Sequence, residues 1–76
     1  MDKQLYILTE KAINEAVSGN FAKAIEYNEL ILKADKTNVD ALLRLGFAYL
    51  HEAQFKAAKK AYSKALKLQP ANIIAK

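Results

Sequence analysis

The chain carries two copies of one residue pattern, and the second copy begins 34 residues after the first. Four residues recur at that distance: Phe21 returns as Phe55, Ala24 as Ala58, Leu32 as Leu66 and Asn38 as Asn72. A repeat of this length accommodates two short antiparallel helices. Such helices cannot bury their apolar sides alone and must stack on neighbouring pairs. The spacing therefore predicts an all-α fold in which helix pairs stack in chain order.

The length and composition indicate one small domain. The chain has 76 residues and no cysteine, so neither a disulfide nor a thiolate metal site can supplement its small core. Self-association or a neighbouring protein is then the expected supplement. The N-terminus lacks the basic start and apolar stretch of a secretion signal, and no apolar run is long enough to span a membrane. We expect a soluble, cytoplasmic protein.

Charge is distributed unevenly along the chain. Residues 1–40 carry five lysines against seven acids, and residues 41–76 carry seven Lys or Arg against Glu52 alone. The last predicted helix contains five of these cations: Lys56, Lys59, Lys60, Lys64 and Lys67. Such a stripe either forms a solvated outer surface or binds phosphates or an acidic partner. Because no arginine or aromatic platform accompanies the lysines, we favour the solvated surface.

Apolar residues at three- to four-residue spacing predict four helices, over about residues 2–18, 21–34, 39–51 and 55–68. Gly19 and Asn20 supply the positive φ that ends the first helix, and Asn38 is expected to cap the third. Pro70 ends the fourth helix, because proline excludes the preceding residue from the helical region. Residues 71–76 resemble the start of a fifth helix that is cut short.

Gly46 lies inside the third predicted helix, where glycine costs about 1 kcal/mol relative to alanine. We interpret this glycine as a point of close contact between helices. The approaching helix is expected to offer the small side chains of Ala58, Ala61 and Ala65.

The second copy of the pattern resembles the tetratricopeptide repeat. Leu42 stands where that family often has tryptophan, and the other signature positions are filled by Leu45, Gly46, Tyr49, Ala58, Tyr62, Ala65 and Pro70. The resemblance implies one domain over residues 1–76, with two helix-turn-helix repeats that form a short right-handed α-solenoid. Repeat 1 covers about residues 5–38 and repeat 2 about residues 39–72, with 73–76 starting a truncated third repeat or a capping helix.

The first copy matches the family only in its turn and second helix. Five of its residues depart from the second copy: Lys11 replaces Leu45, Ala12 replaces Gly46, Glu15 replaces Tyr49, Asn28 replaces Tyr62 and Lys36 replaces Pro70. Terminal repeats are often atypical because they meet water, so we interpret the first helix as the start of the array. Asn72, Ile73 and Ile74 show no such adaptation, and we expect a further segment or a second copy to cover that end.

In tetratricopeptide arrays the first helix of each repeat lines a concave groove, which is the family's usual ligand site. The resemblance places eight candidate partner-binding residues there: Tyr6, Ile13, Val17, Leu43, Arg44, Phe47, Leu50 and His51. The strip is mostly apolar, which suits an amphipathic helix or an extended peptide. The alternative is that the same strip packs against another copy of the chain.

The family's best-known charged groove clamps the terminal carboxylate of a peptide with lysine, asparagine and arginine. Only Arg44 fits that scheme here. Asp40 occupies the place of a partner lysine, and Thr9 and Ile13 occupy the lysine and asparagine places of the first repeat. The sequence therefore argues against binding of chaperone tails.

Nothing in the sequence favours catalysis, a cofactor or a metal. His51 is the only histidine, so a transition-metal site lacks ligands. Ser18 and Ser63 have no base at helical spacing, and the two glycines do not form a phosphate-binding loop. We predict a non-enzymatic protein-interaction or scaffolding module. A self-assembling unit, expected as a homo-oligomer, is the alternative, and binding of nucleic acid or an acidic partner through the lysines is a minor one.

Overall fold

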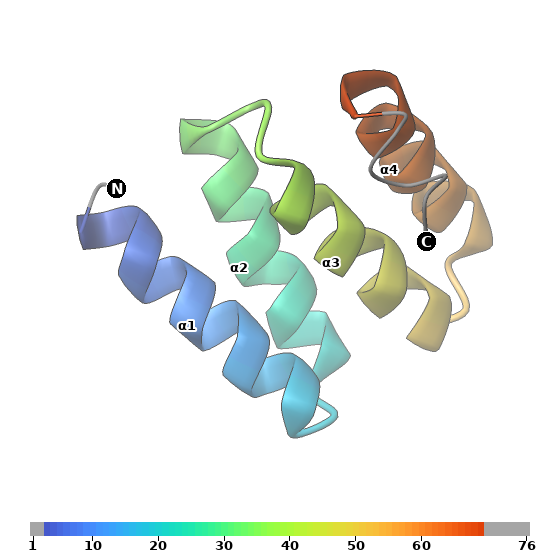
Figure 1. The fold of residues 1–76 in the computed structure, drawn as a ribbon. Helices are drawn as coiled ribbons and strands as arrows, with labels where there is room; N and C mark the ends of the chain where they lie inside the picture. The colour runs from blue at the N-terminus through green and yellow to red at the C-terminus, as the bar shows by residue number, and fades with distance from the viewer. Residues whose placement is uncertain (1–2, 70–76) are drawn as a thin grey trace.

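The computed structural model describes residues 3–69 as four helices that lie side by side in chain order (Figure 1). They are α1 (Lys3–Val17), α2 (Phe21–Ala34), α3 (Val39–His51) and α4 (Phe55–Leu68). Each helix packs on its neighbours in the chain, and the described residues include no strand. The all-α prediction is confirmed, and the bounds of α2 and α4 agree with the sequence to the residue. The expected fifth helix lies outside the described residues.

The turn between α1 and α2 is closed by two backbone hydrogen bonds. The Gly19 N–H donates to the carbonyl of Ala16 at 3.1 Å, and the Asn20 N–H donates to that of Glu15 at 2.8 Å. This is the Schellman arrangement, in which the residue after the helix takes a positive φ. Gly19 has a φ of 83° and Asn20 a φ of −89°, so glycine alone supplies the left-handed conformation.

The turn between α3 and α4 repeats this geometry one period later. The Ala53 N–H donates to the carbonyl of Leu50 at 3.0 Å, and the Gln54 N–H donates to that of Tyr49 at 2.8 Å. Ala53 adopts a φ of 59°, although an alanine pays a steric cost there that glycine does not. The 34-residue period therefore holds in the backbone as well as in the sequence.

Asn38 caps α3 as the sequence predicted. Its side-chain oxygen accepts a hydrogen bond of 2.9 Å from the N–H of Ala41. The cap satisfies one of the N–H groups that a helix N-terminus leaves unpaired.

The core is built mainly from small side chains. Most of its buried apolar residues are alanines: Ala12, Ala24, Ala41, Ala48, Ala58, Ala61 and Ala65. Because alanine side chains are short, the helix axes can approach closely, and the larger Ile31, Leu42 and Leu45 fill the remaining space. Ala12 is the one buried residue of α1, whereas α3 has six. The difference agrees with a position of α1 at the end of the stack.

Gly46 marks a close approach, but its partner differs from the one expected. A Cβ at position 46 would lie 2.6–2.8 Å from three ring atoms of Tyr62, which are its nearest neighbours. The alanines of α4 line the helix interface, yet the aromatic ring lies over the bare backbone. At the equivalent positions of the first repeat stand Ala12 and Asn28, both buried. The first repeat thus has the methyl group of Ala12 where the second repeat has Gly46. Opposite it stands Asn28, which is smaller than Tyr62.

Candidate functional site

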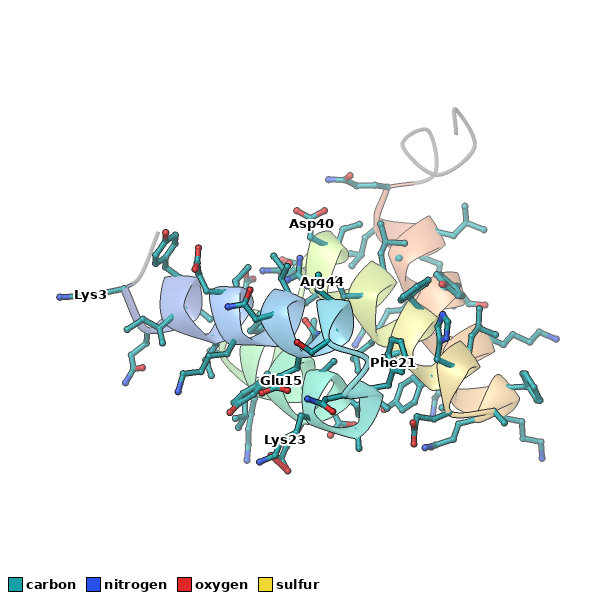
Figure 2. All side chains as sticks on the ribbon, turned by 90° about the horizontal axis from the view of Figure 1, so that it is seen from below. Lys3, Glu15, Phe21, Lys23, Asp40 and Arg44 are labelled. Carbon is teal, nitrogen blue, oxygen red and sulfur yellow. The ribbon has the colours of Figure 1, made fainter. Side chains whose placement is uncertain are left out.

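Three rings gather where the start of α2 meets the C-terminal half of α3. Phe21 stacks on His51 with ring centroids 4.3 Å apart and an interplanar angle of 11°. Phe47, one turn before His51, lies 4.5 Å from the histidine ring and 6.0 Å from Phe21 in an edge-to-face arrangement. Figure 2 shows Phe21 beside this part of α3. Aromatic pairs at such distances stabilise an interface beyond the area they bury, so this cluster joins the two repeats.

A second link joins the repeats one turn earlier in α3, on the N-terminal side of Phe47. Arg44 donates from Nε to the side-chain oxygen of Asn28 at 3.0 Å, and Asn28 in turn donates to the carbonyl of Ala24 at 2.9 Å. Asn28 is fully buried, so the two bonds satisfy a polar group that would otherwise cost stability. Burial lowers the pKa of Arg44, and the nearby Asp40, which precedes it by one turn of α3 (Figure 2), acts in the opposite direction.

A third contact between α2 and α3, which is again polar, is made by Tyr49. Its hydroxyl donates to the carboxylate of Glu29 at 2.7 Å. Burial, together with that hydrogen bond and the charge of Glu29, raises the pKa of Tyr49 to about 12. The phenol therefore stays neutral, and the bond stays intact, throughout the physiological range of pH.

Several of the candidate binding residues, including Phe47 of the ring cluster, are exposed to solvent. Val17 at the end of α1 is 82% exposed, Ile13 is 42% exposed, and Phe47 and Leu50 of α3 are 48% and 45% exposed. Leu43 packs partly against the buried cluster around Leu42. Ile13 and Phe47 occupy the same position in successive repeats, so they project from the same side of the helices that carry them.

Tyr6, near the start of α1, is also exposed. A hydrogen bond from its hydroxyl to Glu10 raises the pKa of the phenol.

The structure adds three residues that the sequence did not assign to this region. Phe21 was expected only as part of the apolar pattern of α2, Asn28 was noted only as a departure from the repeat pattern, and Glu29 was not singled out. The available signal was Asn28 in the place of Tyr62, since a buried amide needs a polar partner from the next repeat. Three of the eight predicted partner-binding residues contact α2: Phe47, His51 and Arg44. The other five make no ring contact or side-chain hydrogen bond to α2.

The five lysines of α4 are all exposed, as the interpretation as a solvated surface requires. Within residues 3–69 the structure shows no group of three potential metal ligands and no pocket. No helix in this range is both long and apolar enough to cross a membrane.

The stacked helix pairs define a protein of the helical-repeat class. A family model described as the tetratricopeptide repeat matches residues 39–72, which is the second of the two pairs. A DnaJ protein of Arabidopsis thaliana, described as a P58IPK homolog, is 41% identical over 54 residues. The match covers 71% of this chain and 11% of that protein. No solved structure gives a significant match. Residues 39–72 are therefore assigned to the tetratricopeptide repeat family.

Membership has a general functional meaning. Tetratricopeptide repeats generally mediate protein–protein interactions and are typically not catalytic. The chain spans about a tenth of the length of the Arabidopsis protein, so the similarity does not extend to that whole protein.

Proposed function

We propose that the chain binds a peptide or helix of a partner protein on the open surface formed by α1 and α3. We call this the α1–α3 surface and define it by Ile13, Val17, Leu43, Phe47 and Leu50, with Tyr6, Arg44 and His51 at its edges. The observation that carries the proposal is the exposure of Phe47 at 48%, although its ring is held in place by Phe21 and His51. An exposed aromatic side chain whose position is fixed loses little entropy on binding and is the usual anchor of a protein interface.

The chemistry of the surface favours a mostly apolar partner. Ile13, Val17 and Leu50 offer aliphatic area around the ring of Phe47. Arg44 can bind a carboxylate at the edge of the surface by donating hydrogen bonds to it, but Asp40 beside it offsets the positive charge of Arg44. A partner segment with apolar residues at helical spacing and few charges on its bound side fits this pattern best.

Selection from a library of displayed helical peptides against the immobilised chain tests the proposal. Selected peptides should lose binding to the variants Phe47→Asp and Leu50→Asp while both variants keep their helical circular dichroism. Leu30→Asp is the matched control, because it places the same charge on a leucine of α2 that is 46% exposed and lies outside this surface. Peptides that bind the Phe47 and Leu50 variants as well as the original chain would refute the assignment.

Self-association is the second candidate function. The observation that supports it is apolar exposure at both ends of the helix stack, with Val17 at 82% on α1 and Phe55 at 65% on α4. Open apolar area of this kind is often covered by another copy in small repeat proteins. Sedimentation velocity over a concentration series distinguishes the two candidates. A monomer at every concentration would exclude self-association and leave the α1–α3 surface free for a foreign partner.

A further inference from the structure

The last helix carries a mostly exposed strip of residues at the end of the stack, although the ring of Tyr62 within it also lies over Gly46 of α3. Phe55, Lys59, Tyr62 and Leu66 follow one another at intervals of four, three and four residues, which places them on one side of α4. Phe55 is 65% exposed and Leu66 is 40% exposed. We call these four residues the α4 strip. It lies at the end of the stack, on a different helix from the α1–α3 surface.

The chain itself contains a covered version of this strip. One repeat earlier, the equivalent apolar and polar positions are held by Phe21, Asn28 and Leu32, and α3 packs on them. The rings of Phe47 and His51 cover Phe21. As a result, Phe21 and Leu32 are half-buried, whereas Phe55 and Leu66 are exposed.

The covering helix also contributes a polar contact at the middle of the first-repeat strip. Arg44 of α3 bonds to Asn28 there. Because both repeats share the same turn geometry, α4 presents Phe55 and Leu66 at the positions from which Phe21 and Leu32 of α2 contact α3. Tyr62 takes the place of Asn28 between them.

The charges around the α4 strip indicate what kind of helix would fit. Lys59 lies within the strip, where the first repeat has Ile25, and Lys56 and Lys67 lie on its outer border. No acid occurs in α4 to neutralise them. A cationic residue within an apolar strip favours a partner that places a carboxylate opposite.

We propose that the α4 strip binds an acidic amphipathic helix of another protein. The bound helix places apolar side chains, four residues apart, on Phe55, as Phe47 and His51 do on Phe21. It directs aspartate or glutamate side chains towards Lys59 and the lysines on the border. This site is independent of the α1–α3 surface, so the chain can hold two protein segments at once.

A synthetic peptide with the sequence of α3 and its caps tests the proposal directly. The probe spans residues 38–52 and carries Arg44→Glu, which keeps the two side chains that cover Phe21 and turns the polar contact into a carboxylate. Titration into the 76-residue chain, followed by fluorescence anisotropy, should show saturable binding that weakens as salt is added. Nuclear magnetic resonance should place the perturbed amides on α4.

Substitutions in the chain give the sharper test. Phe55→Asp should weaken binding by about tenfold or more, because it removes the aromatic anchor at the start of the strip. This variant should still fold, since Phe55 is exposed and an acid is favourable at a helix start. Lys59→Glu should weaken binding by about threefold to tenfold. Lys64→Glu is the matched control: it reverses the same charge on the other flank of α4 and should change binding by less than about twofold.

Several results would overturn the proposal. These are no saturable binding, equal effects of the Lys59 and Lys64 variants, or binding that depends on Phe47 and not on Phe55. Binding to phosphatidylserine vesicles without binding to the peptide would assign α4 to an anionic membrane surface. Self-association that is abolished by Phe55→Asp would assign the strip to a second copy of the chain.

Discussion

Replacement of Gly46 by alanine should destabilise the fold, although alanine is the better helix former. Gly46 lies within α3 with the Tyr62 ring directly over it. On helix propensity alone, the substitution would stabilise the protein by about 1 kcal/mol. The opposing term is steric, because a new Cβ would lie 2.6–2.8 Å from three ring atoms.

The steric term should exceed the propensity gain. Contacts under 3.0 Å require the ring or the helix to move, and overpacking of this kind typically costs about 1–3 kcal/mol. The close atoms belong to the half-buried side chain of Tyr62, which would have to shift to admit the new Cβ. Subtraction of the propensity gain leaves an expected net loss of up to about 2 kcal/mol.

A double-mutant cycle isolates this contact. In a Tyr62→Ala background the obstacle is gone, so Gly46→Ala should become stabilising by up to about 1 kcal/mol. Urea unfolding followed by circular dichroism measures all four proteins of the cycle. The reasoning fails if Gly46→Ala stabilises the original chain, or if its effect has the same sign and size in both backgrounds.

Two further predictions concern the turn and the polar link between repeats. Gly19→Ala should destabilise by about 1–2 kcal/mol because its φ is 83°, whereas Ala53→Gly should be neutral or stabilising by up to about 1 kcal/mol; thermal unfolding of the two variants checks the difference in sign. Tyr49 has a pKa raised to about 12, so its contribution to stability is present below pH 10 and is lost as the pH rises from 10 towards 12. Glu29→Gln should bring that pKa closer to 10, as measured by titration of the Tyr49 ring resonances, and an unchanged pKa would contradict the assigned hydrogen bond.

The sequence predicted the backbone closely because its signals are local. The turn glycine, the Asn38 cap and the apolar spacing act within one or two helical turns, and each was confirmed. The 34-residue period then fixed the order in which helices pack, because equivalent segments must bury equivalent sides. The family resemblance added the expected concave surface, which remains a proposal.

The contacts between repeats could not be predicted in the same way. Which side chain lies over Gly46 depends on the rotation of α4 about its axis, and the alanines expected from the sequence are replaced there by Tyr62. The Arg44–Asn28 bond joins residues 16 positions apart, and no local pattern links them. Ring stacking of Phe21 on His51 likewise depends on the crossing of α2 and α3. Such contacts are set by tertiary packing rather than by local preference.

The most direct test of the functional account is a chemical-shift map of the isotope-labelled chain with a peptide selected for binding. The account predicts perturbed amides around Ile13, Val17, Phe47 and Leu50, with the resonances around Phe55 unchanged. Perturbations confined to α4, or spread evenly over all four helices, would contradict the assignment of the α1–α3 surface as the principal binding surface.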